Sequence, residues 1–455
     1  MRGRPLPRRS LLAGGASLGF LRAAPAFAAA DPAAPTAGAR HWVGGWAAAL
    51  TPPARRGRSV HGFARRTLRL VVHLSVGGDR IRLRLSNLYG TRPLDLGAVT
   101  VARRGKGAAT EPGTGRRVTF AGRRSATVPV GAEVVSDPVH LTVHADGDLV
   151  VSIHLPTATG PTTWHGGAKQ TSYLSTRGDH TADESGSAFH RRLLSWFFLE
   201  GVDVATTDAD RTVVAFGDSL TEGGAIPDNV NLRWPDVLAR RLARAGRRGP
   251  GLSVVNTGIG GNRLLSDVGT GADGRIHLGV NAQARFARDV LQQTAVSDAI
   301  VLIGTNDLGA GAGVHRGARL TSGQVIAGLA ALAHRAHAAR IALHAGTIIP
   351  NALLHPARER MRAHVNHWIR SGGAFDSVVD FDAALRDPEA PRQLRPRYDS
   401  GDGVHPNTAG MHAMAQAVDL SVLGRAGTYL LPVTGSGASD GRRAPAPQPG
   451  QHSPG

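Results

Sequence analysis

A short stretch around Ser219 carries the residues best suited to chemistry. Four apolar residues, 213–216, lead into Gly217-Asp218-Ser219, and a segment with helical spacing begins at Trp234. Ser219 is therefore expected where a buried strand ends and the chain turns, which is where open α/β sheets place their ligands. Because a serine hydroxyl is a weak nucleophile, catalysis would also need a histidine base, an orienting carboxylate and donors for an oxyanion.

Three further motifs offer these groups, and each follows a predicted strand. Asn-Thr-Gly-Ile-Gly-Gly-Asn occupies residues 256–262, Gly-Thr-Asn-Asp occupies 304–307, and Asp-Gly-Val-His occupies 402–405. The carboxyl ends of parallel strands share one edge of a sheet, so motifs far apart in sequence would converge there. The expected topology, rather than any single motif, therefore predicts one composite site.

The region predicted to position these motifs, residues 206–428, alternates short apolar strands with helical stretches. Strands are expected at 212–216, 252–256, 299–303, 341–345 and 378–381, and helices at 234–245, 282–292, 322–338, 357–371 and 407–423. Five βα units in succession predict an α/β fold with a doubly wound parallel sheet and helices on both faces.

The preceding region, residues 41–205, has a period of two and no convincing helical spacing. Residues 67–76 and 80–87 flank Gly77-Gly78-Asp79, which predicts a hairpin with one solvated face. Further short alternating runs follow, so the region is predicted to be an antiparallel β-sandwich or jelly roll. Its role is open, because its tryptophans could bind carbohydrate or simply fill a core.

The outer segments are predicted to lie outside the folded regions. Residues 1–28 resemble an export signal, with Arg8-Arg9 before an apolar run and the small-x-small sequence 26–28 at its end. The paired arginines suggest the twin-arginine route. Residues 29–40 are predicted to be a linker and 432–455 a disordered tail, while no later stretch is apolar enough for a spanning helix. We therefore expect a secreted protein without a membrane span.

Composition excludes several classes of protein. The chain has no cysteine, so it has no disulfides, thiolate metal sites or cysteine nucleophile. The formal net charge is +19, but Lys106 and Lys169 are the only lysines and the arginines are scattered rather than clustered. This pattern indicates a compositional bias, and no nucleic-acid partner is expected.

Together and in this order, the four motifs resemble the SGNH (GDSL) hydrolase family over roughly residues 208–425. The resemblance implies a flavodoxin-like fold and a hydrolase that needs neither metal nor cofactor. The preceding β region, together with Trp234-Pro235 and the Gly-Ile-Gly-Gly-Asn-Arg sequence at 258–263, resembles exported, two-domain actinobacterial-type members described as lipase-like or acylhydrolase-like. The chain departs from many exported members because it lacks disulfides, which affects the subgroup rather than the mechanism.

By this resemblance, Ser219 is the nucleophile and His405 the base that Asp402 orients. The Ser219 backbone N–H, the Gly261 backbone N–H and the Asn306 side-chain amide would form the oxyanion hole. The chemistry agrees, because a glycine at 261 permits close approach of the main chain and an amide donates without adding charge. The spacing of Asp402 and His405 places both on one loop, so the imidazole needs no distant partner.

Each motif also has an ordinary structural interpretation. Ser219 could be a helix N-cap, with Glu222 completing a capping box. Asn306-Asp307 could form an Asx turn. Asp307 is expected to be structural rather than catalytic, and Asp218 is expected to tether backbone near the nucleophile.

The sequence therefore predicts an exported serine esterase that works through an acyl-enzyme. Short acyl or acetyl esters are preferred as substrates, including those on small molecules or polysaccharides. Two alternatives remain: a lipase or phospholipase acting on longer acyl chains, and a catalytically silent polysaccharide-binding surface protein. Residues 266–279 lack the bulky side chains that an acyl groove would need, and the intact Ser219, Asp402 and His405 set argues against a silent protein.

Overall fold

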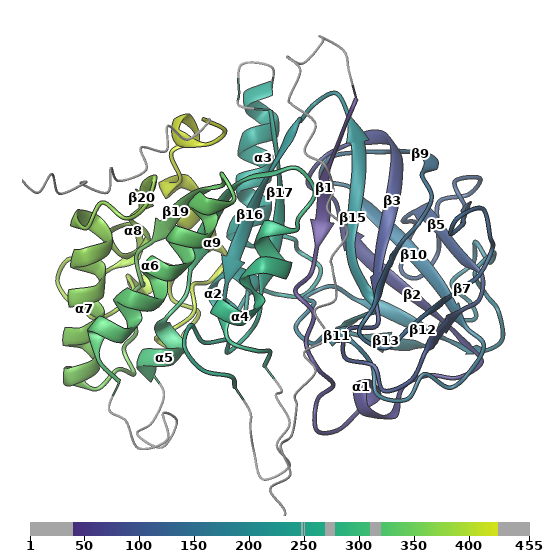
Figure 1. Cartoon of the computed structure of the whole chain (residues 1–455), viewed down its shortest axis with the longest axis horizontal. Helices are drawn as coiled ribbons and strands as arrows, with labels where there is room; N and C mark the ends of the chain where they lie inside the picture. Colours follow the sequence, from purple (N-terminus) through teal and green to yellow (C-terminus); the bar gives the residue numbers. More distant parts are fainter. Residues whose placement is uncertain (1–39, 247–248, 250, 269–277, 310–319, 426–455) are drawn as a thin grey trace, which may run out of the picture. The chain divides into compact units, whose positions relative to one another are not determined.

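The computed structural model describes residues 40–246, 249, 251–268, 278–309 and 320–425 (Figure 1). The predicted leader, nearly all of the predicted linker and the predicted tail lie outside these residues and stay predictions. Among the described residues, no helix has the length and apolarity needed to cross a bilayer.

The N-terminal region is built from antiparallel strands in two main sheets. The first contains β1 (His41–Ala47), β15 (Leu199–Thr206), β3 (Gly78–Ser86) and β8 (Glu133–Val135) in that order, with β9 (Val139–Val143) also on β3. The second has the order β13 (Arg191–Leu193), β12 (Ser172–Arg177), β2 (Arg66–His73), β10 (Asp148–Leu155), β5 (Val99–Arg103) and β6 (Arg116–Val118). Two small sheets pair β4 (Leu94–Leu96) with β7 (Ala126–Val128) and β11 (Trp164–His165) with β14 (Trp196–Phe197), and α1 covers Arg58–His61.

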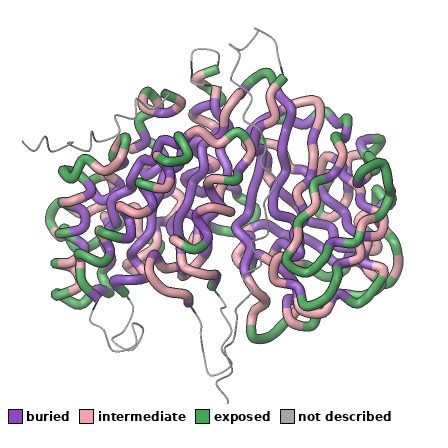
Figure 2. The backbone as a smooth tube through the Cα atoms, viewed as in Figure 1, coloured by how far each residue is buried: buried purple, intermediate pink, exposed green. Residues whose placement is uncertain are grey.

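Apolar side chains from the two main sheets form one core, which confirms the predicted sandwich. Ile81 and Leu83 of the first sheet and Leu70 and Val151 of the second are each fully buried in the same cluster. Figure 2 shows the strands of this region as largely buried and their connections as exposed. Trp46 and Trp196 belong to this core and meet edge to face at 4.8 Å.

The predicted hairpin between residues 67–76 and 80–87 is wrong. β2 pairs with β10 and β12, whereas β3 pairs with β15, β8 and β9, so the two strands lie in different sheets. The connecting turn is held by other parts of the chain, since the backbone N–H of Ser75 donates to the Gly45 carbonyl at 2.9 Å. Alternation of apolar residues places one face of a strand in a core, but it does not reveal which strand lies beside it.

The C-terminal region contains a five-stranded parallel sheet in the order β17-β16-β18-β19-β20. The strands are β16 (Arg211–Gly217), β17 (Leu252–Gly258), β18 (Val296–Leu302), β19 (Ala342–Gly346) and β20 (Ser377–Val379). The second strand in sequence, β17, thus lies at one edge beside β16, and β18, β19 and β20 follow in order on the other side of β16. This 2-1-3-4-5 order is that of flavodoxin-like folds, which confirms the predicted fold class.

Helices cover both faces of the parallel sheet. Val214 and Phe216 of β16 pack in the same core as α4 (Ala282–Phe286), α6 (Ser322–Ala338) and α7 (Pro356–Ser371). Val213 and Ala215 point to the opposite face, where they share a core with α3 (Trp234–Ala245), α8 (Phe381–Leu385) and α9 (Thr408–Ala417). Because both faces are covered, the strands are continuous apolar runs rather than alternating ones.

Two predicted helices differ from those observed. The helix expected at 282–292 becomes π-helical at Ala287–Leu291. The helix expected at 407–423 ends at Ala417, and a separate 3₁₀ turn follows at Leu420–Val422. In both cases the apolar spacing continues past the point where the backbone changes, so it does not mark the end of the α-helix.

The two regions pack directly against each other along β1 and the first two parallel strands. The Gly44 backbone N–H donates to Thr212 Oγ1 at 3.0 Å, and Ser75 Oγ accepts from the Val254 N–H at 3.3 Å. A Cβ at Gly44 would lie 2.9 Å from Val255 Cγ1. Glycine at position 44 therefore permits the close approach of β1.

Candidate active site

Ser219 lies on the tight turn that joins β16 to a short helix, α2 (Ser219–Glu222). Asp218, not Ser219, is the N-cap of this helix, and its Oδ1 accepts from the Leu220 N–H at 3.0 Å. The capping-box interpretation of Ser219 is therefore wrong. A Cβ at Gly217 would lie 2.4 Å from the Leu302 carbonyl oxygen, so only glycine fits at the end of β16. The turn leaves the Ser219 hydroxyl free to interact with another element.

That hydroxyl contacts the loop that precedes α9. Ser219 Oγ lies 2.9 Å from His405 Nε2, and His405 Nδ1 lies 2.7 Å from Asp402 Oδ2. The three side chains thus form a continuous line of hydrogen bonds. A Cβ at Gly224 would come within 3.2 Å of both the His405 ring and Ser219 Cβ, so the small residue leaves room for this contact.

Asp402 is held as a carboxylate by its own loop. Its Oδ1 accepts from the backbone N–H groups of His405 at 2.8 Å and Val404 at 2.9 Å. Partial burial acts against ionisation, but these bonds and the His405 side chain outweigh it and lower the pKa of Asp402 to about 2. The side chains of His405 and Asp402 remain 26% and 48% exposed, so solvent and substrate can reach them.

The expected oxyanion donors come from the loops that follow β16, β17 and β18, which are neighbours in the sheet. The loop after β17 is fixed to the nucleophile turn, because the Ile259 N–H donates to the Gly217 carbonyl at 3.1 Å. Gly261 has a φ of 73°, a conformation that favours glycine. Within the described parts of the chain, neither the Ser219 nor the Gly261 backbone N–H donates a hydrogen bond.

Asn306 and Asp307 lie on α5 (Thr305–Gly309), directly after β18. Asn306 Nδ2 donates to the Asn262 carbonyl at 3.0 Å, which leaves its second N–H for a ligand. Asp307 is fully buried and accepts from the Leu264 and Leu265 N–H groups at 2.7 and 3.0 Å. Asp307 therefore fixes the far end of the glycine-containing loop and does not face a substrate.

Asp218 is fully buried beneath the nucleophile. Burial raises the pKa of Asp218 to about 7, and the nearby Asp307 carboxylate acts in the same direction. Within the described residues, its Oδ2 atom has no hydrogen-bond partner. Asp218 tethers the backbone of the turn through Leu220, as the sequence suggested, and does not contact Ser219 Oγ or His405 in the described hydrogen-bond network.

Sequence reasoning missed Arg285, which holds the turn and the oxyanion loop together. Its side chain is fully buried, and its guanidinium donates to the carbonyl oxygens of Gly217 at 2.7 Å and Thr257 at 2.8 Å. It also donates to Asn262 Oδ1 at 3.0 Å and pairs with Asp289 at 2.9 Å. In the sequence, Arg285 and Asp289 resemble an ordinary i, i+4 pair on a solvated helix face, so no signal marks their burial.

The N-terminal region also contacts the nucleophile helix. His165 Nε2 lies 3.2 Å from Glu222 Oε1, while His165 Nδ1 bonds the Ala49 carbonyl at 2.8 Å. A Cβ at Gly260 would lie 2.6 Å from Glu222 Oε2, so the carboxylate is packed against the glycine-containing loop. Among the described residues, no group of three or more histidine or acidic side chains is arranged to hold a metal ion.

The fold and the site together define a class: hydrolases with a serine, a histidine and a carboxylate at the carboxyl edge of a flavodoxin-like sheet. Residues 213–418 match the family described as GDSL-like Lipase/Acylhydrolase, and this region of the chain belongs to that family. The resemblance proposed from the four motifs is thereby confirmed.

Solved structures of low sequence identity also match a part of the chain. A proposed lipolytic protein of the G-D-S-L family from Desulfitobacterium hafniense DCB-2 is 20% identical, with a TM-score of 0.34, covering 47% of this chain and 99% of its own. A GDSL-like lipase from Bacteroides thetaiotaomicron is 19% identical, with a TM-score of 0.32, covering 47% and 87%. The acetyl xylan esterase Axe2 from Geobacillus stearothermophilus is 20% identical, with a TM-score of 0.35, covering 46% and 93%. A comparison with curated protein sequences found no match.

Proposed function

We propose that the protein is a serine esterase that hydrolyses carboxylic esters through an acyl-enzyme. The observation that carries the proposal is the line of hydrogen bonds from Ser219 Oγ through His405 to Asp402, at 2.9 and 2.7 Å. A base within this distance of a hydroxyl, itself oriented by a carboxylate, is the arrangement that activates a serine.

In the first half of the proposed reaction, Ser219 Oγ attacks the ester carbonyl carbon and its proton passes to His405 Nε2. Asp402 accepts the hydrogen bond from Nδ1–H and stabilises the imidazolium. The negative charge on the carbonyl oxygen is met by the N–H groups of Ser219, Gly261 and Asn306. When the C–O bond to the alcohol breaks, His405 returns the proton to the leaving oxygen.

The second half regenerates the enzyme. His405 removes a proton from a water molecule, and the resulting oxygen nucleophile attacks the acyl carbon bound to Ser219. Collapse of this intermediate releases the carboxylic acid, and Ser219 recovers its proton from His405. Apart from this water molecule, every group that acts in these steps belongs to the chain itself.

The acyl group of the substrate would lie beside Leu278, which is 42% exposed. Its Cδ1 is only 2.5 Å from the position of a Cβ at Gly261, so an apolar side chain borders the oxyanion glycine. Contact with this leucine by itself would cover only a few carbon atoms, so it favours a short acyl group over a long one. We therefore favour short acyl or acetyl esters as substrates.

The proposal is tested with p-nitrophenyl esters from acetate to palmitate, assayed in EDTA. We expect turnover by the unaltered protein, highest with the short esters, and none above background with Ser219→Ala. Ser371→Ala, which removes an exposed hydroxyl on α7, is the matched control and should retain full activity. If the unaltered protein and Ser219→Ala acted alike on every ester, the esterase proposal would be wrong.

Export belongs to the same proposal and depends on the leader at residues 1–28. Expression of the full chain in a bacterial host, followed by N-terminal sequencing of the protein recovered outside the cytoplasm, tests it. Cleavage after residue 28 would support export. Retention of the intact leader in the cytoplasm would contradict it without affecting the esterase assay.

A further inference from the structure

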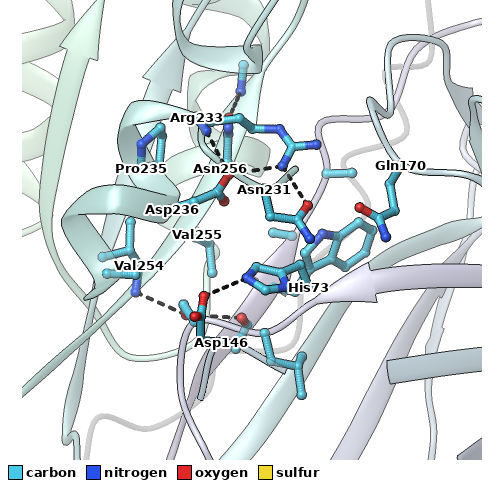
Figure 3. Close-up of a pocket in the computed structure, with 18 of the residues that line it drawn as sticks. His73, Asp146, Gln170, Asn231, Arg233, Pro235, Asp236, Val254, Val255 and Asn256 are labelled. Carbon is cyan, nitrogen blue, oxygen red and sulfur yellow. Dashed lines mark hydrogen bonds and ion pairs between the residues drawn. The ribbon is translucent and has the colours of Figure 1, made fainter. Parts of the chain in front are cut away.

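A cavity separate from the catalytic residues lies where the N-terminal region packs against β17 and α3. Its volume is about 790 Å³, which includes space open to solvent. Neither Ser219 nor His405 is among the residues that line it. The cavity is drawn in Figure 3.

One part of the cavity wall is apolar. Trp46 and Trp196 line it from the β-sandwich, and Pro235, Ala239 and Val255 line it from the C-terminal region. The two indole rings are only 8% and 6% exposed and pack edge to face, so they form a closed apolar boundary rather than an open stacking surface. This wall alone would accept many small molecules, so the polar groups decide the class of ligand.

The charged and titratable side chains that line the cavity already contact one another. The pairs are Arg240 with Asp146 (2.6 Å), His73 with Asp146 (2.9 Å), Arg233 with Asp236 (3.0 Å) and His165 with Glu222 (3.2 Å). A charged ligand would therefore find its natural counter-charge already occupied. Removing water from a charged ligand that finds no free counter-charge is costly, so the cavity favours a neutral ligand.

Gln170 supplies the unsatisfied polar group. The residue is only 1% exposed, and among the described residues neither its Nε2 nor its Oε1 has a hydrogen-bond partner. Arg240 Nη1 is likewise buried without a partner there. In Figure 3 the Gln170 amide lies across the pocket from Pro235 and Asp236. Buried polar atoms are almost always bonded, so the amide calls for a molecule that both donates and accepts.

We propose that this cavity binds a small, neutral molecule that carries several hydroxyl groups, such as a simple sugar. A hydroxyl group can donate to Gln170 Oε1 and accept from its Nε2 or from Arg240 Nη1. The C–H groups of the ligand would lie against the apolar wall. The site is distinct from the catalytic serine and does not depend on the proposed esterase activity.

The experiment is isothermal titration calorimetry on the full chain with D-xylose and D-glucose, and with D-glucuronate as the charged control. We expect one site per chain for the neutral sugars and no binding of glucuronate. Gln170→Leu should weaken binding about tenfold or more, the effect of losing a hydrogen-bonded partner in a buried site. Ester hydrolysis by this variant should be unchanged, because Gln170 does not contact the catalytic residues.

A second variant guards against misfolding of Gln170→Leu. Ala243 lines the cavity but is exposed, so Ala243→Phe should obstruct the entrance without disturbing the core and should also abolish binding. The proposal would be overturned if neither sugar bound, which would leave ordered water as the partner of Gln170. It would also fail if both variants bound sugar as the unaltered protein does, or if blocking Ser219 with a sulfonyl fluoride displaced the sugar.

Discussion

Replacing Asn306 with alanine separates the catalytic role of its amide from its structural role. One N–H of the amide holds the Asn262 carbonyl at 3.0 Å, and the other is proposed to meet the oxyanion. Loss of the structural bond should lower the free energy of unfolding by about 1 kcal/mol. Loss of the oxyanion donor should lower kcat by a factor of roughly 10² to 10³, or about 3 kcal/mol at the transition state. The catalytic effect therefore exceeds the structural one by a wide margin.

The assay pairs ester hydrolysis under saturating substrate with urea denaturation of the same variant. Asn229→Ala is the control outside the site, where Asn229 Nδ2 donates to Thr171 Oγ1 at 2.9 Å and Oδ1 accepts from the Thr171 N–H at 2.7 Å. Because it loses two bonds and places alanine at a φ of 65°, the control should lose more stability than Asn306→Ala and still keep its kcat. Asn306→Asp should be at least as inactive as the alanine variant, because a carboxylate repels the developing negative charge.

Two results would refute this reasoning. If Asn306→Ala lost stability but kept kcat, the amide would serve only to hold the loop after β17. If KM rose with kcat unchanged, the amide would bind ground state and transition state equally and would not be an oxyanion donor.

Three other changes test other parts of the structure. Asp402→Asn should lower kcat by about 10³ to 10⁴, because the amide favours the wrong tautomer of His405. In the unaltered enzyme the pKa of Asp402 is about 2, so protonation of this carboxylate should not lower kcat/KM above about pH 4. Arg285→Met removes the partner of a buried carboxylate and of the carbonyl groups at the ends of β16 and β17. It should lower the free energy of unfolding, measured in urea, by about 3–5 kcal/mol. A change smaller than about 1 kcal/mol would show that the nucleophile turn is stable without Arg285. Burial raises the pKa of Glu200 well above its usual range, so the folded state binds this proton more tightly than the unfolded state. The free energy of unfolding should therefore fall as the pH rises above about 4.3, the usual pKa of a glutamate. In Glu200→Gln, denaturation curves measured at several pH values should show a smaller fall.

The sequence predicted the fold class because local patterns determine most of it. Continuous apolar runs mark the strands that are buried on both faces, and helical spacing fixes α3 and α6 at the predicted residues 234–245 and 322–338. The strand order could be predicted only through the resemblance to a known family, because the spacing of apolar residues does not show which strand lies beside which. The same limit explains the wrong hairpin between β2 and β3.

The candidate site was predictable where its residues form motifs and not where they act through burial. Ser219, Asp402 and His405 stand in short segments of unusual composition, and the structure brings them within hydrogen-bond distance. Arg285 stands in a plain helical segment, and only the fold shows that its guanidinium lies beneath the nucleophile turn. Gln170 is equally inconspicuous, because its significance depends on its having no partner among the described residues in a cavity that two distant regions form.

The contact between β1 and β17 has a consequence for aggregation. β17 is an outer strand of the parallel sheet, and such a strand offers unpaired backbone groups that can template pairing with another molecule. Here the β-sandwich lies along it, with Gly44 close to Val255 and Ser75 accepting from the backbone of Val254. The N-terminal region thus shields the hydrolase sheet from other copies of itself, whatever else it binds. A chain cut near residue 206 would expose this edge and with it a surface prone to self-association.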